Sequence, residues 1–193
     1  MENGTRTNLT PVISRQLTSI LEKMGAISSA WPFMRLICRV YRPIVEREIK
    51  QLDLDSEDRV LFVGGGALPY SAVLFHELTG ARIHVLDRDR QACLHSRRIQ
   101  RRFSPGIFCV FCRCGKHCNP EHYSAIVVAR QVAPKEEVVR YLVENAAPRT
   151  RILVREGSFG GSASRLIQVQ PDPPSKLSAQ PSVPDTKYFA RNG

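Results

Sequence analysis

The stretch Val60-Leu-Phe-Val-Gly-Gly-Gly-Ala-Leu-Pro69 decides the fold of this chain. The apolar run up to Val63 is typical of a buried strand, the three glycines allow a tight turn, and Pro69 suits the first position of a helix. A second apolar segment follows at 82–86 and ends at Asp87. A strand, a glycine turn, a helix and a second strand closed by an acid form the pattern of nucleotide-binding α/β proteins.

Outward from this stretch, short apolar segments alternate with segments of helical periodicity. We predict strands at 59–63, 82–86, 107–111, 125–129 and 151–154, and helices at 68–78, 90–103 and 134–145. Alternation of this kind implies a parallel sheet with helices on both faces. The expected fold class is therefore α/β, a Rossmann-like sheet preceded by a short helical lid.

The N-terminal part differs in composition from the rest. Residues 1–8 are polar and are expected to be disordered. Apolar residues at helical spacing predict helices at 10–24 and 31–52, the second interrupted by Pro43. We therefore predict a helical lid over 9–57 and a nucleoside-binding domain over 58–193, which includes a proline-rich segment.

The positive charge of the chain is compatible with a polyanionic partner but does not by itself favour nucleic acid. The net charge is +10, and its densest run is Arg97-Arg-Ile-Gln-Arg-Arg102. Because no basic-aromatic RNA-binding signature accompanies it, we interpret this run as the solvated end of a helix. No apolar stretch reaches the roughly 18 residues of a membrane span, and the N-terminus lacks the pattern of a signal peptide. We expect a cytoplasmic protein that does not contact membranes; homodimerisation stays open.

Four cysteines lie close together in Cys109-x-x-Cys112-x-Cys114-x-x-x-Cys118. Zinc sites usually need two well separated pairs, which this spacing does not provide. The predicted strand at 107–111 would direct Cys109 into the core, where free cysteine acts as a small hydrophobe. We predict that the cluster is structural and holds no metal.

The glycine turn and Asp87 together indicate the ligand. Asp87 lies 21 positions after Gly66, close to the spacing at which an acid meets both ribose hydroxyls. Pro69 takes the place of the third glycine of a dinucleotide site, which lets the helix approach a pyrophosphate, and the turn lacks the Lys-Ser/Thr ending of a phosphate loop. The pattern favours S-adenosylmethionine, which carries adenosine without phosphates.

These residues resemble the nicotianamine synthase-like enzymes, in which a Gly-x-Gly-x-Leu-Pro turn replaces the usual methyltransferase loop. Tyr41 and Glu48 keep the spacing of that family's Tyr-x-x-x-x-x-x-Glu helix. Further resemblance lies at Pro134-Lys-Glu136, at Arg155 after its apolar strand, and at Tyr188-Phe-Ala-Arg191. The resemblance covers about Trp31 to Gly193. It implies transfer chemistry at the γ-carbon of the aminocarboxypropyl arm, with release of methylthioadenosine.

The chain also departs from that family. Only 58 residues precede Arg59, where the family has a large helical domain, and Glu22 is the one nearby candidate for its amine-deprotonating acid. This points to the small azetidine-2-carboxylate synthases, in which the α-amine of S-adenosylmethionine closes a ring on its own γ-carbon. The alternatives are an aminocarboxypropyl transferase, a small-molecule methyltransferase, and a silent nucleotide-binding partner protein.

The expected site residues fall into two groups. Trp31, Phe33 and Tyr41 are candidates for an aromatic lid over the sulfonium, although aromatic residues at helical spacing are often core residues. The residues expected to bind the cofactor are Trp31, Phe33, Gly64, Gly65, Gly66, Ala67, Leu68, Asp87, Arg88, Arg113, Cys114, Ala129 and Arg130.

The second group is expected to act in the reaction. Tyr41 is a candidate acceptor for the amine, and Arg155 a candidate clamp for the carboxylate of the arm. Tyr41 could instead be a core residue, and Arg155 could form a surface ion pair. Glu48 could be a solvated charge on its helix, and Ser158 an ordinary loop hydroxyl. The expected catalytic residues are Tyr41, Glu48, Arg155 and Ser158.

Overall fold

The computed structural model describes residues 30–103, 106, 108–157 and 163–170. The helices are α2 (Ala30–Leu52), α3 (Tyr70–Thr79), α4 (Arg90–Phe103) and α5 (Lys135–Asn145), with short 3-10 turns η2 (Gly115–His117) and η3 (Pro120–His122). The strands are β1 (Arg59–Val63), β2 (Arg82–Asp87), β3 (Phe108–Cys112), β4 (Ala125–Val128), β5 (Arg151–Glu156) and β6 (Ala163–Gln168). The predicted helix at 10–24 lies outside the described residues.

The strands form one sheet in the order β3-β2-β1-β4-β5-β6. The first five strands are parallel, and β6 runs antiparallel to β5. In the register, Val63 pairs with Leu86 on one side and with Val128 on the other. The ends of β1, β2 and β4 therefore lie level at one edge of the sheet, which is called the carboxyl edge below.

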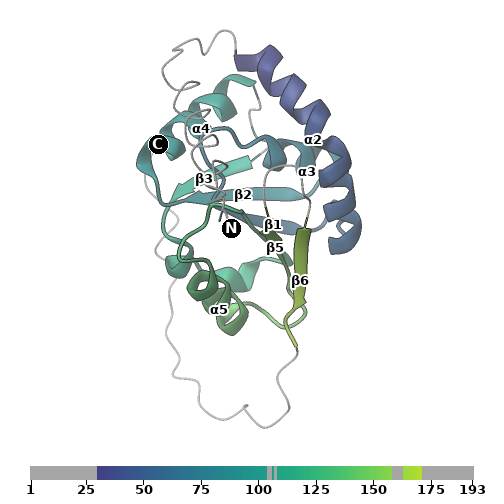
Figure 1. Cartoon of the computed structure of the whole chain (residues 1–193), viewed down its shortest axis with the longest axis vertical. Coiled ribbons are helices and arrows are strands. Elements are labelled where there is room, and N and C mark those ends of the chain that lie inside the picture. Colours follow the sequence, from purple (N-terminus) through teal and green to yellow (C-terminus); the bar gives the residue numbers. More distant parts are fainter. Residues whose placement is uncertain (1–29, 104–105, 107, 158–162, 171–193) are drawn as a thin grey trace, which may run out of the picture.

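Two apolar layers hold the helices to the sheet. On one face, helices α2, α3 and α4 pack with strand residues such as Phe62 and Val85; on the other, α5 packs with residues such as Leu61 and Ile126. Figure 1 shows α2, α3 and α4 above the sheet and α5 below it. The strands alternate in the face to which their side chains point, so each contributes to both layers. The predicted Rossmann-like architecture is confirmed.

Helix α2 is part of the larger layer. Val45 and Leu52 are fully buried in it, and the helix packs on α3 and on β5. Pro43 lies within the helix. The sequence therefore located this helix correctly to within one residue at its start.

Strand β6 was not predicted. Its side chains are exposed or half-buried throughout, with Leu166 45% exposed. Ile167 packs partly buried against the α5 layer, but the strand has no run of alternating apolar and polar residues by which the sequence could mark it. Pairing with β5 is what makes this segment a strand.

The expectation for Cys109 was wrong. Strand β3 runs one residue later than predicted, and Cys109 is exposed while Phe108 and Val110 are buried against α4. β3 is one of the two edge strands of the sheet, and its face away from α4 is not covered at Cys109. Arg97 of α4 donates from Nε and Nη2 to the carbonyl of Val110, at 3.2 and 3.0 Å, and thereby occupies a backbone acceptor of this edge.

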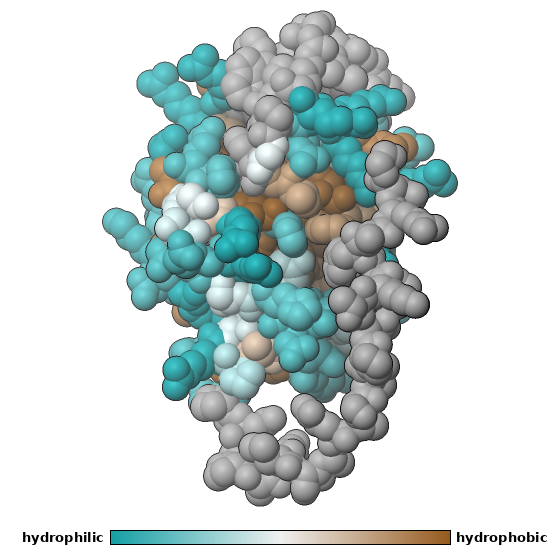
Figure 2. All heavy atoms as spheres, turned by 180° about the vertical axis from the view of Figure 1, so that it is seen from behind, coloured by the Kyte–Doolittle hydropathy of each residue, from teal (hydrophilic) through white to brown (hydrophobic). Residues whose placement is uncertain are grey.

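The surface mixes polar and apolar areas. Figure 2 shows the molecule from behind, with a hydrophobic area in the middle of that face and hydrophilic side chains around it. Four large hydrophobic side chains are exposed in the described part of the chain: Leu36, Val40, Leu94 and Leu166. Among the described residues, no helix combines the length and apolar character needed to cross a membrane.

Candidate functional site

The glycine turn and Asp87 meet at the carboxyl edge. The carboxylate of Asp87 accepts the N–H of Gly66 at Oδ2, at 2.7 Å, and the N–H of Asp89 at Oδ1, at 2.9 Å. Each carboxylate oxygen keeps a further lone pair. The carboxylate is thereby fixed beside the turn while it can still accept hydrogen bonds from a pair of hydroxyls.

Backbone geometry explains why the turn needs glycine. Gly64 and Gly66 have φ angles of +82° and +68°, in the left-handed region that side chains with a Cβ rarely adopt. A Cβ on Gly65 would lie 2.1 Å from Cγ1 of Val85, so there is no space for one. The N–H groups of Gly64 and Gly65 donate to the carbonyl of Leu86. The turn is therefore packed closely onto β2.

Other expected binding residues lie at the ends of neighbouring strands. Arg113 donates its N–H to the carbonyl of Asp87 at 2.8 Å, and Ala129 donates to the carbonyl of Val63 at 2.9 Å. Arg88 reaches the carbonyl of Ala133 with Nη1, at 2.8 Å. Leu68, Cys114 and Arg130 are half-buried, and Ala67 is buried. Parallel strand ends bring these segments together at the carboxyl edge.

The prediction missed Tyr70 and Ser71, which contact Tyr41 and Arg155, and also Gln131. Gln131 donates from Nε2 to the carbonyl of Gly64 at 2.8 Å, and this nitrogen would lie 3.9 Å from a Cβ on Gly66. Its side chain thus lies next to the glycine turn. Its position shortly after the apolar strand β4 was the signal available in the sequence, since residues after parallel strands gather at this edge.

Tyr41 projects from α2 toward the same edge. Its ring contacts Tyr70, the first residue of α3, with centroids 4.6 Å apart. Burial and a hydrogen bond with Tyr70 raise the pKa of Tyr41 to about 12, while the charges of Arg130 and Arg155 oppose the rise. The phenol therefore stays protonated at neutral pH and can donate as well as accept a hydrogen bond.

Glu48 and Arg155 form a buried bidentate ion pair. Nε and Nη2 of Arg155 donate to the two carboxylate oxygens of Glu48, at 2.8 and 2.6 Å. Nη1 donates to the hydroxyl of Ser71 at 3.1 Å, and the guanidinium lies 5.8 Å from the ring centre of Phe62. Glu48 is only 5% exposed. The pair joins α2, α3 and β5 at the carboxyl edge.

Several expected residues cannot be placed. Ser158, Glu22 and Tyr188-Phe-Ala-Arg191 lie outside the described residues, as do the side chains of Trp31 and Phe33. Of the expected catalytic residues, the structure brings together Tyr41, Glu48 and Arg155.

The cysteines do not converge on one point. Cys109 and Cys112 are exposed, Cys114 is half-buried, and Cys118 is buried. Within the described ranges, no three His, Cys, Asp or Glu side chains are grouped so that they could hold a metal ion.

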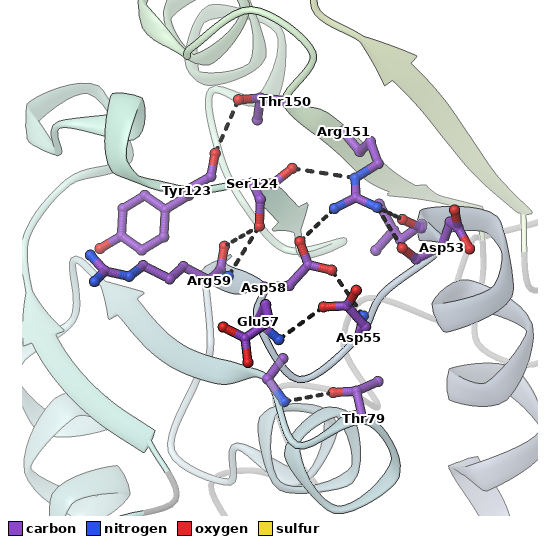
Figure 3. Close-up of polar contacts among 12 residues, drawn as sticks. Asp53, Asp55, Glu57, Asp58, Arg59, Thr79, Tyr123, Ser124, Thr150 and Arg151 are labelled. Atoms are coloured by element: carbon purple, nitrogen blue, oxygen red, sulfur yellow. Dashed lines mark hydrogen bonds and ion pairs between the residues drawn. The ribbon is translucent and has the colours of Figure 1, made fainter.

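A depression of about 840 Å³ lies at the opposite, amino edge of the sheet, lined by residues such as Arg59, Tyr123 and Arg151. Figure 3 shows how the polar groups here satisfy one another. Arg151 donates to the carboxylate of Asp58 at 2.6 Å and to the carbonyls of Leu52 and Asp53, at the end of α2. These contacts hold elements together, so the depression carries no functional assignment.

Comparisons with known proteins agree with the fold. No family model matches the sequence. The L-histidine 2-aminobutanoyltransferases of Pseudomonas aeruginosa strains UCBPP-PA14 and PAO1 are each 30% identical over 124 residues, which cover 59% of this chain and 44% of the relative. The chain thus spans less than half the length of these curated relatives.

Two solved structures show the likeness in three dimensions. A mutant of MtNAS, a nicotianamine synthase, in complex with S-adenosylmethionine has a TM-score of 0.61 at 21% identity, over 74% of this chain and 56% of that one. An RNA methyltransferase from Salinibacter ruber in complex with S-adenosyl-L-homocysteine has a TM-score of 0.58 at 14% identity, over 71% and 97%. The chain has the Rossmann-like fold of class I S-adenosylmethionine-dependent methyltransferases, which nicotianamine synthase shares.

Proposed function

We propose that this chain binds S-adenosylmethionine at the carboxyl edge and breaks the bond between its sulfonium and the γ-carbon of its aminocarboxypropyl arm. Asp87, already held by two backbone N–H groups, accepts the ribose hydroxyls. The adenosine lies against the glycine turn, where Gly66 carries no side chain to obstruct it. The observation that supports this placement is the contact between Gly66 and Asp87.

The proposed reaction is ring closure to azetidine-2-carboxylate. The neutral α-amine attacks the γ-carbon, the carbon–sulfur bond breaks, and its electron pair stays on sulfur in methylthioadenosine. The new ring nitrogen keeps both hydrogens as a secondary ammonium. Holding the arm with its nitrogen in line with the carbon–sulfur bond contributes several kcal/mol, on the order of what pre-orientation supplies in other enzymes.

The polar groups at this edge are consistent with a reaction in which the α-amine of S-adenosylmethionine loses its proton without a strong base from the protein. Every described carboxylate around it has a partner within the protein: Glu48 with Arg155, Asp87 and Asp89 with backbone N–H groups, and Glu156 with Arg165. An α-amine with an ordinary pKa of about 7.7 loses its proton readily once desolvated. The neutral phenol of Tyr41 is sufficient to accept a hydrogen bond from it.

The residues then take distinct roles. Tyr41 orients the amine, and the Glu48–Arg155 pair holds α2 in the position that brings Tyr41 to the site. The N–H groups of Arg155 that no described residue occupies bind the carboxylate of the arm. Trp31 and Phe33 cover the sulfonium with aromatic faces, and Ser158 contributes a hydroxyl beyond strand β5.

A second candidate is transfer of the same arm to a separate amine. The name of the curated relatives, L-histidine 2-aminobutanoyltransferase, favours it, because it describes transfer of a four-carbon amino acid unit. The amine of L-histidine is itself an α-amine, so the pKa of the nucleophile does not separate the two candidates, and the products must.

Incubation of the protein with S-adenosylmethionine alone, followed by mass spectrometry, tests the proposal. We expect methylthioadenosine and azetidine-2-carboxylate in equal amounts. Methylthioadenosine that forms only after addition of L-histidine would support the transferase instead. S-adenosylhomocysteine as the product would indicate methyl transfer, and absence of turnover would overturn both proposals. Calorimetric binding of S-adenosylmethionine, measured separately, distinguishes a silent binder from a protein that does not bind.

A further inference from the structure

The positive charge of the chain is concentrated in one segment. Residues 90–120 contain seven Arg and Lys residues and no Asp or Glu, within a chain of net charge +10. This segment forms α4, β3 and η2, at the β3 edge of the sheet. A strongly basic surface therefore lies next to the end of the sheet that is farthest from β6.

Helix α4 separates its charges from its apolar residues. Ala92, Cys93 and Ile99 are buried on the sheet side. Arg90, Leu94, Arg98 and Arg101 are exposed and recur at spacings of three and four residues, on one face of the helix. We call these four residues the basic face. At 1.5 Å per residue the face is about 16 Å long.

The charges of this face lack acidic partners. In the described part of the chain, no ion pair involves Arg90, Arg98 or Arg101, and the same holds for other exposed arginines such as Arg35 and Arg140. What distinguishes α4 is that several such charges share one helix face. Helix α4 itself contains no acidic residue. Like charges three or four positions apart on a helix repel one another. A negatively charged partner would relieve this repulsion.

Leu94 indicates the chemistry of that partner. Its side chain is 38% exposed and lies one helical turn from both Arg90 and Arg98. An apolar side chain flanked by charged ones matches on a small scale the apolar centre and polar rim of a protein–protein interface. A nucleic acid backbone offers phosphates but no apolar surface, and residues 90–101 include no Phe, Tyr or Trp on which bases could stack. A second copy of the chain would bring the same positive charge.

We propose that the basic face docks an acidic protein, through a helix or an extended segment in which Glu or Asp residues flank an apolar side chain. The guanidinium groups bind the carboxylates with paired hydrogen bonds. Leu94 packs against the apolar side chain between them. The proposal is independent of the reaction at the carboxyl edge.

The experiment uses the whole chain and a fluorescein-labelled synthetic peptide of 16 residues, with Glu at helical spacing on both sides of one Leu. Binding is followed by fluorescence anisotropy at 50 and 200 mM NaCl. We expect binding that weakens at the higher salt concentration, since exposed charges are screened. Arg98→Glu and Leu94→Ala should each weaken it by about five-fold or more.

Matched controls separate this face from overall charge. Arg140→Glu makes the same change in charge on the exposed side of α5, on the opposite face of the sheet, and should leave binding within about two-fold. A peptide with Gln in place of Glu should not bind. Circular dichroism of each variant checks folding, which exposed positions should not disturb.

Three outcomes would overturn the proposal. The first is absence of binding at 50 mM NaCl. The second is an equal loss in Arg98→Glu and Arg140→Glu, which would assign binding to net charge alone. The third is tighter binding of a 20-base-pair DNA duplex than of the peptide, unaffected by Leu94→Ala, because the face would then recognise phosphates.

Discussion

The carboxylate of Glu48 and the guanidinium of Arg155 form a bidentate pair between residues 107 positions apart, with Oε2 and Nη2 at 2.6 Å. Their side chains are 6% and 15% exposed. The pair fastens α2 to the end of β5 and, through Ser71, to α3. Tyr41 lies on the same helix, so its position depends on this contact.

Removal of one partner should destabilise the fold. Glu48→Ala leaves the guanidinium of Arg155 buried without a counter-charge, and the free energy of unfolding in urea should fall by about 3–5 kcal/mol. Glu156→Ala, which breaks the half-exposed pair with Arg165, is the control and should cost at most about 1 kcal/mol. Similar small losses in both variants would show that the buried pair does not anchor α2.

Asp87→Ala should weaken binding of S-adenosylmethionine by about 1.5–3 kcal/mol, because hydrogen bonds from the ribose hydroxyls to a charged group are lost. Titration calorimetry measures the change. Asp55→Ala removes a carboxylate near the start of β1, at the amino edge, and should leave the affinity unchanged. An unchanged affinity in Asp87→Ala would remove the main support for a nucleoside site.

Tyr41→Phe removes the hydroxyl and keeps the ring, so it tests the contribution of the hydroxyl alone. It should keep the contact with Tyr70 and most of the binding, while the rate of methylthioadenosine release falls about ten- to a hundred-fold, for about 1.5–3 kcal/mol in the barrier. Tyr41→Ala should be slower still, since the ring is lost as well. If Tyr41→Phe turns over at the wild-type rate while Tyr41→Ala merely melts at a lower temperature, Tyr41 is a core residue.

Gly65→Ala should lower the free energy of unfolding by about 1–3 kcal/mol, because the new methyl would overlap Cγ1 of Val85. The double variant Gly65→Ala, Val85→Ala removes that methyl group. The double variant should therefore lose less free energy of unfolding than the sum of the losses in the two single variants. Additive losses in urea unfolding would show that the turn does not pack on Val85 in this way.

Protein purified without a chelator should contain less than one equivalent of zinc by elemental analysis. Cys109 and Cys112 are exposed while Cys118 is buried, so the four cysteines of this cluster do not face a common centre. A stoichiometric zinc content that disappears together with the folded state when a chelator is added would contradict the prediction.

Local patterns in the sequence predicted those parts of the site that follow strands. Gly64, Gly66 and Asp87 could be recognised because a turn and the end of a neighbouring strand have characteristic residues. The role of Glu48 could not be read in the same way, since a charge on a helix is usually solvated. Its partner Arg155 lies on another element, and only packing of α2 against the sheet removes both from water.

The sequence by itself determined the parallel order of strands and helices and the helix α4, because burial imposes a period that the apolar residues must follow. The tertiary structure alone decided the exposure of Cys109 and the pairing of β6 with β5. Each of these depends on which strand lies at an edge. Such relations join residues far apart in the chain, so no local pattern encodes them.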